Sequence, residues 1–121
     1  MYDPDRHAIQ LGLRVIEGDP GRGRRGLWVG NKTIIIRGDL TAIQRRCTIA
    51  HEIVHAEYDP PFVPQYLSAK AEARADRIAA SRLIDPEDYH RACNAYEYQN
   101  QVAYELGVTT KILRAYQRNT P

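Results

Sequence analysis

The chain has 121 residues, of which 43% are hydrophobic and 26% charged, and its formal net charge is +2. These values are typical of a globular protein, and the length allows one compact unit or one domain with a small appendage. No apolar run is long enough to span a membrane, and the charge alone does not indicate nucleic-acid binding. Cys47 and Cys93 are too few for a disulfide framework, and no signal-peptide pattern is present. We therefore expect reduced core thiols in a cytoplasmic protein without a membrane partner.

The first forty residues alternate between short apolar segments and glycine-rich turns. We expect a helix over residues 2–11, a strand over residues 13–17 and a loop over residues 18–26. Residues 27–29 and 33–36 are strand-like, and Gly-Asn-Lys between them predicts a hairpin. Together the strands predict a small antiparallel three-stranded sheet.

The loop carries a cluster of three basic residues, Arg22, Arg24 and Arg25. Such a cluster could bind nucleic acid or an acidic partner. Because few basic residues flank it, we favour a solvated loop without a partner.

The next segment, residues 42–58, contains neither Gly nor Pro and predicts a helix. Thr41 and Gln44 form a capping-box signature at its start, with Asp39 as a second N-cap candidate. Prolines 60 and 61 end it. Cys47 is expected in its buried stripe, although a thiolate ligand one turn before His51 is the alternative.

Residues 51–55 of this helix read His-Glu-Ile-Val-His, an HExxH motif. Two histidines four apart project from one helix face, so His51 and His55 can bind one Zn²⁺. Glu52 sits about 100° around the helix, where it can act as a base toward water without binding the metal. The alternative is an ordinary amphipathic helix with two half-buried histidines.

A third ligand is expected from the following helix, residues 69–84, with Ser68 as its N-cap. Glu72 and Asp76 lie four apart on its otherwise small, apolar face, where two acids are costly unless a cation meets them. We assign Glu72 as the third zinc ligand. Asp76 would accept a hydrogen bond from the non-ligating N–H of one histidine. The alternative is a pair of surface acids facing nearby Lys and Arg side chains.

The combined pattern resembles the ImmA/IrrE family of metallopeptidases. It reads His51-Glu52-x-x-His55, then Glu72-x-x-Ala75-Asp76-x-x-Ala79-Ala80-x-x-Leu83-Ile84-x-Pro86. Ile53-Val54 replaces the usual Leu-Gly, and Ile78 replaces the usual Phe. The resemblance implies a protein substrate, a helix-turn-helix transcriptional repressor of a phage or mobile element. In zinc peptidases of this kind an edge strand beside the metal pairs with the extended substrate.

Two helical pieces follow. Asp85-Pro86 predicts the start of a helix running to about residue 98, with Cys93 on its core face. Residues 102–116 resemble a helix-turn-helix, with Gly107 at the left-handed turn and Thr109 capping the second helix. Its exposed side would carry Lys111, Arg114 and Arg118. Binding to nucleic acid is possible, but we favour a structural or substrate-docking role.

The sequence therefore predicts an α+β fold with the antiparallel sheet packed on the HExxH helix. Residues 1–86 would form a zinc metallopeptidase core, and residues 87–121 a helical segment packed on it. The predicted activity is that of a zinc-dependent endopeptidase. The alternative is a DNA-binding or antirepressor module with a structural or degenerate zinc site. Side chains that could assist at the oxyanion are Tyr58, Tyr66, Tyr89 and His90, which the sequence does not rank.

Overall fold

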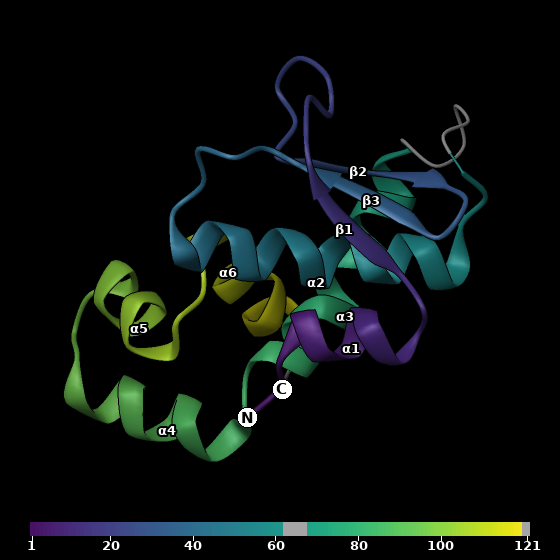
Figure 1. Ribbon diagram of the computed structural model, residues 1–121. Helices are drawn as coiled ribbons and strands as arrows, with labels where there is room; N and C mark the ends of the chain where they lie inside the picture. Colours follow the sequence, from purple (N-terminus) through teal and green to yellow (C-terminus); the bar gives the residue numbers. More distant parts are fainter. Residues whose placement is uncertain (62–67, 120–121) are drawn as a thin grey trace.

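The helices and strands follow one another along the chain nearly as the sequence predicts (Figure 1). The computed structural model describes residues 1–61 and 68–119. Among these residues, no helix combines the length and apolarity that crossing a bilayer requires. The elements are α1 (Pro4–Gln10), β1 (Arg14–Glu17), β2 (Gly26–Gly30), β3 (Thr33–Ile36), α2 (Ala42–Tyr58), α3 (Ala69–Leu83), α4 (Pro86–Ala95), α5 (Gln99–Leu106) and α6 (Thr110–Asn119).

Helix α2 lies between the sheet and helix α3 (Figure 1). It begins at the predicted capping box. The Thr41 hydroxyl accepts a hydrogen bond from the Gln44 backbone N–H (3.1 Å), and the Gln44 side-chain carbonyl accepts one from the Thr41 N–H (3.0 Å). Ile49 and Ile53 are fully buried against the sheet. The opposite face carries the predicted stripe of Cys47, Ala50 and Val54, with Ile43 partly buried.

The sheet is mixed, so the prediction of an antiparallel sheet was wrong. Its order is β1-β3-β2, and β3 pairs parallel with β1 and antiparallel with β2. The connection over residues 18–25 leaves room for one strand between β1 and β2, since neighbouring strands lie about 4.8 Å apart. Strand β2 therefore forms at the far edge, and β3 returns between the other two. Three of the four β3 residues are buried, whereas none of β1 is, as expected for a central and an edge strand.

Strands β2 and β3 form the predicted hairpin. Asn31 and Lys32 at its turn have φ angles of 50° and 56°, which is the left-handed region that a type I′ turn requires at both positions. A register shift between Trp28 and Gly30 lies just before the turn. In the described part of the chain β2 pairs with β3 alone, so its other edge is free of strands.

Gly26, the first residue of β2, lies close to the HExxH helix. A Cβ atom at this position would lie 2.6 Å from Thr48 Cγ2, 3.2 Å from Glu52 Cγ and 3.3 Å from the Ile35 carbonyl oxygen. No side chain fits there without a shift of its neighbours. The glycine thus sets how closely β2 passes the side chain of Glu52.

We expect Gly26→Ala to lower the free energy of unfolding by about 1–3 kcal/mol, the usual cost of overpacking. In a Thr48→Ser background the loss should be smaller, because the nearest atom to the new methyl group is removed. Urea unfolding of the four proteins of this double-mutant cycle, with a chelator present, measures the difference. An equal loss in both backgrounds would contradict the close approach to Thr48.

The C-terminal helices share a core with the HExxH helix. Helix α6 packs on α3, and its fully buried Leu113 belongs to the same apolar cluster as Val54 and Ala79. A boundary between residues 1–86 and 87–121 stays a prediction. The shared cluster holds α6 against the helix that carries Glu72.

The turn between α5 and α6 has the predicted local geometry. Gly107 has a φ of 68°, in the left-handed region, and Thr109 accepts a hydrogen bond from the Ile112 N–H (3.3 Å). The Arg46 guanidinium of α2 donates to the Gly107 carbonyl (2.7 Å), which ties the turn to the core. Resemblance to a DNA-binding helix-turn-helix stays a prediction.

Helix α4 ends at Ala95, three residues before the predicted end near residue 98. Tyr96 has extended backbone, and α5 begins at Gln99, so the chain reverses where no Gly or Pro marks a stop. Cys93 is exposed, and its prediction as a core residue was wrong. The reason is that α4 buries only Ala92, and the next residue projects about 100° away from that contact.

Candidate metal centre

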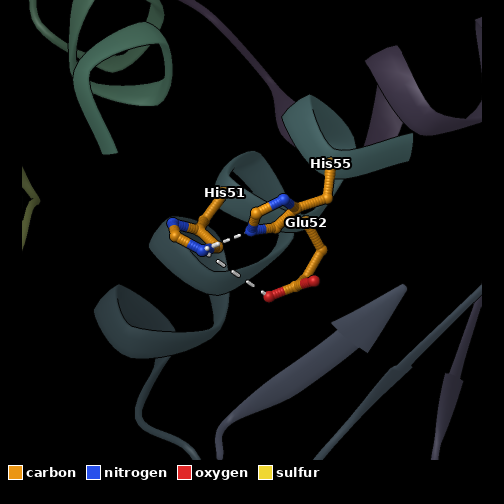
Figure 2. Close-up of side chains that lie close together, drawn as sticks. All are labelled: His51, Glu52 and His55. Atoms are coloured by element: carbon orange, nitrogen blue, oxygen red, sulfur yellow. Dashed lines mark hydrogen bonds and ion pairs between the residues drawn. The ribbon is translucent and has the colours of Figure 1, made fainter. Parts of the chain in front are cut away.

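The two histidines of the HExxH motif face each other across one turn of α2. Figure 2 shows both rings turned toward the same point, and their Nε2 atoms lie 3.1 Å apart. The side chain of His55 is fully buried, and that of His51 is 12% exposed. One side of the site is therefore fixed inside the core, and the other is open toward solvent.

Helix α3 brings Glu72 against both histidines. Its Oε1 lies 2.7 Å from the His55 Nε2 and its Oε2 3.4 Å from the His51 Nε2. Ligand atoms bound about 2.0–2.1 Å from a tetrahedral Zn²⁺ are separated by roughly 3.3 Å. The three separations among these side chains are close to that value, so their nitrogen and oxygen atoms can share one ion.

Glu52 follows His51 on α2 and is only 5% exposed. Its Oε2 is 3.9 Å from the His51 Nε2, and its carboxylate points toward the sheet side of the helix (Figure 2). The ligand atoms of His51, Glu52 and His55 all lie within 4.8 Å of one another, a group that can hold a metal ion. Both carboxylates thus reach the histidine pair, with Glu72 making the shorter contacts.

Each histidine also contacts a carboxylate through its other ring nitrogen. The Nδ1 atom of His51 lies 2.8 Å from Asp76, and that of His55 lies 2.8 Å from Asp59. When each Nδ1 carries hydrogen and donates to its carboxylate, both Nε2 lone pairs are left facing the same point. The structure brings Asp76 to the Nδ1 of His51, and its role behind a metal ligand stays a prediction.

Asp59 is the residue that the sequence reasoning missed. It directly follows α2 and lies four residues after His55, the spacing that stacks side chains on one helix face. Arg74 of α3 contacts its carboxylate, and Trp28 of β2 donates to its carbonyl oxygen (3.2 Å). Burial would raise the pKa of Asp59, but hydrogen bonds from His55 and Arg74 outweigh it and lower that pKa. Asp59 therefore stays ionised beside His55.

The charges of the site call for a cation at the histidines. Burial would lower the pKa of His51, but hydrogen bonds with Asp76 and Glu72 raise it to about 10. Burial would likewise raise the pKa of Glu72, but its contacts with the two histidines lower it far below the usual range. Without a metal, a proton on a histidine supplies the positive charge that the carboxylates favour. A divalent cation fits the same donor set.

An open cleft of about 750 Å³ leads to these residues. Its floor is the face of α2 that carries His51 and Glu52, and α3 contributes Glu72 and Asp76. Of the side chains considered for the oxyanion, Tyr66 lies outside the described residues. The other three, Tyr58, Tyr89 and His90, are not among the described residues that line the cleft.

We expect Asp59→Asn to weaken metal binding by about 10- to 100-fold, the usual effect of losing a carboxylate behind a ligating histidine. The matched control is Arg74→Gln, which removes the same ion pair but leaves Asp59 beside His55. Competition with a chromophoric chelator measures both affinities. If Arg74→Gln weakens binding as much as Asp59→Asn, the effect comes from the ion pair and not from the histidine contact.

The fold and the site define an α+β protein with a candidate metal site, on an HExxH helix that lies between a small mixed sheet and a carboxylate-bearing helix. The chain matches the IrrE N-terminal-like domain, Peptidase M78, over residues 5–115, and it belongs to this family. Comparisons with curated proteins and with solved structures gave no significant match. The predicted resemblance is thereby confirmed, and the family supports a metallopeptidase function.

Proposed function

We propose that the protein is a zinc-dependent endopeptidase in which His51, His55 and Glu72 hold the metal. The observation that carries the proposal is the meeting of both Nε2 atoms and the Glu72 carboxylate at separations of 2.7–3.4 Å. Two imidazoles and one carboxylate are a donor set typical of catalytic zinc, which keeps one position for water or substrate. A closed structural site would need a fourth protein ligand and would have no use for Glu52.

In the proposed mechanism Glu52 moves the proton. Zinc bound at this site would polarise the peptide carbonyl and make an attacking water more acidic. The Glu52 carboxylate accepts the proton of that water as it attacks, and then donates it to the leaving amine. Its burial keeps bulk water from competing for the proton. Asp76 holds the imidazole ring of His51 in place, and Asp59 that of His55, each by a contact with the Nδ1 atom of the ring.

We propose that the substrate binds as an extended strand along β2. This strand lies at an edge of the sheet, and its first residue, Gly26, lines the same cleft as His51 and Glu52. Backbone hydrogen bonds to an edge strand bind a peptide regardless of its side chains and hold it straight across the metal. Such binding suits cleavage within a chain rather than at its end.

We further propose, from the family resemblance, that the target is a helix-turn-helix repressor of a phage or mobile element, cleaved in the cytoplasm. The test is incubation of the zinc-loaded protein with the repressor encoded beside its gene, with and without a chelator, followed by mass spectrometry of the products. Chelator-sensitive cleavage at one bond is the expected result. An intact repressor beside a cleaved unfolded peptide would overturn the substrate but keep the peptidase.

A further inference from the structure

The arginine loop, residues 22–25, forms one wall of the catalytic cleft. The sequence favours a solvated loop without a partner, but all four of its residues line the same cleft as His51, Glu52 and Glu72. Arg22 and Arg25 are exposed, and Arg24 is half-buried. These side chains thus border the path that a substrate would follow along the start of β2.

Helix α6 adds a fourth positive charge from the opposite wall. Its first turn lines the cleft, and the Nζ atom of Lys111 lies 3.8 Å from Asp76 Oδ2. The Lys111 side chain is 70% exposed, so it can also reach a bound ligand. Arg114 and Arg118, the other basic residues of this helix, are not among the described residues that line the cleft.

The acids of the cleft have charged partners on the protein, whereas the arginines of the loop have none among the residues that the structure describes. Glu72 contacts both histidines, and Asp76 contacts His51 and Lys111. Among the described residues, no ion pair involves an arginine of the loop. Among the described residues, four basic and three acidic side chains line the cleft, so with neutral histidines and bound Zn²⁺ its net charge would be +3.

The loop charge also reaches the cleft floor. Burial raises the pKa of the Cys47 thiol, and the positive charges of Arg46 and Arg25 partly offset that rise. Cys47 lies one turn before His51 on α2 and lines the cleft. Arg25 lines the same cleft as Cys47.

We propose that the cleft selects peptide segments with Asp or Glu side chains beside the scissile bond, bound by Arg22 and Arg25 with help from Lys111. The proposal rests on the peptidase function proposed above and gives it a substrate class. A peptide fits better than nucleic acid because Glu52, Glu72 and Asp76 would repel a continuous phosphate backbone, whereas single acidic side chains can lie beside the arginines only. The loop then determines which peptides bind, and the HExxH residues cleave the scissile bond.

The test uses a mixture of decapeptides randomised at every position and the zinc-loaded protein. Mass spectrometry of the products should show Asp and Glu enriched at fixed positions from the cleaved bond. One exposed ion pair predicts an enrichment of roughly 1.5- to 5-fold at each such position. In Arg22→Gln/Arg25→Gln the enrichment should fall toward 1. In the matched control Arg6→Gln/Arg118→Gln, which removes the same charge outside the cleft, it should remain.

The inference and the peptidase proposal can fail separately. Cleavage without acidic enrichment, or equal enrichment in both double variants, overturns the role of the loop. If nothing is cleaved, the peptidase proposal fails. In that case the role of the loop is tested by binding: the decapeptides that zinc-loaded Glu52→Gln retains are identified. If they are not enriched in Asp and Glu, the proposed role of the loop is wrong. Tighter binding of a random-sequence DNA duplex than of any acidic decapeptide, lost in Arg22→Gln/Arg25→Gln, would assign the loop to nucleic acid instead.

Discussion

Glu52→Gln is expected to keep the metal and to lower peptide hydrolysis by about 10²- to 10⁴-fold, the range attributed to a positioned acid–base group. The amide has the size of the carboxylate but cannot accept a proton. Glu52 is buried, and its Oε2 lies 3.9 Å from the His51 Nε2, farther than the 3.4 Å between that atom and Glu72. The variant should therefore separate the chemistry from the metal site.

Metal content and initial rates of cleavage, measured on the same sample, give the comparison. The matched control is Glu97→Gln, an exposed carboxylate between α4 and α5 that should have no effect. A Glu52→Gln protein that keeps a tenth or more of the wild-type rate would rule out this residue as the base. Loss of the metal would instead make Glu52 a ligand.

Glu72→Ala is expected to weaken zinc binding by more than 100-fold, beyond the range for a residue that only supports a ligand. The carboxylate is the one anionic group in the proposed ligand set and lies 2.7 Å from the His55 Nε2. Without it, zinc would keep two neutral ligands on one helix. The link between α2 and α3 through the metal would also be lost.

Thermal unfolding with and without zinc tests the same variant independently. Zinc at about 100 times its dissociation constant should stabilise the wild type by about 2.7 kcal/mol, and the gain should nearly vanish in Glu72→Ala at the same concentration. Glu87→Ala, an exposed acid in the first turn of α4, is the control. Equal zinc affinity in wild type and Glu72→Ala would show that the ligand assignment is wrong.

Much of the candidate site could be predicted because helix geometry converts sequence spacing into position. His51 and His55 are four residues apart on one helix, and Glu72 and Asp76 are four apart on the next. The apolar faces of α2 and α3 require the two helices to pack together, which brings the four side chains to one place. Asp59 follows the same spacing after His55, but its position just past the end of the helix drew no attention to its side chain.

The arrangement of the sheet could not be read in the same way. Strand lengths and the hairpin turn are local properties, and Asn31 and Lys32 mark that turn clearly. The order of strands depends on where a loop lets the chain return, which no local pattern determines. The run of three isoleucines in β3 was the available signal, since a strand apolar on both faces belongs in the middle of a sheet.

The position of the arginine loop could not be predicted because it depends on parts of the chain that are even farther apart in the sequence. Loop residues 22–25 and α6, nearly ninety positions later in the chain, line one cleft because both border the same face of α2. The sequence shows the cluster and its charge but not the cleft beside it. The structure therefore changes the interpretation of this loop from a solvated segment to a wall of the proposed catalytic site.

The most direct test of the central claim is a zinc titration of the metal-free protein, with peptide hydrolysis followed at each addition. If His51, His55 and Glu72 hold one catalytic ion, the rate should rise in proportion to zinc and level off at about one equivalent. Hydrolysis by the metal-free protein would contradict the claim. So would a protein that binds one equivalent of zinc and cleaves no peptide in the randomised mixture.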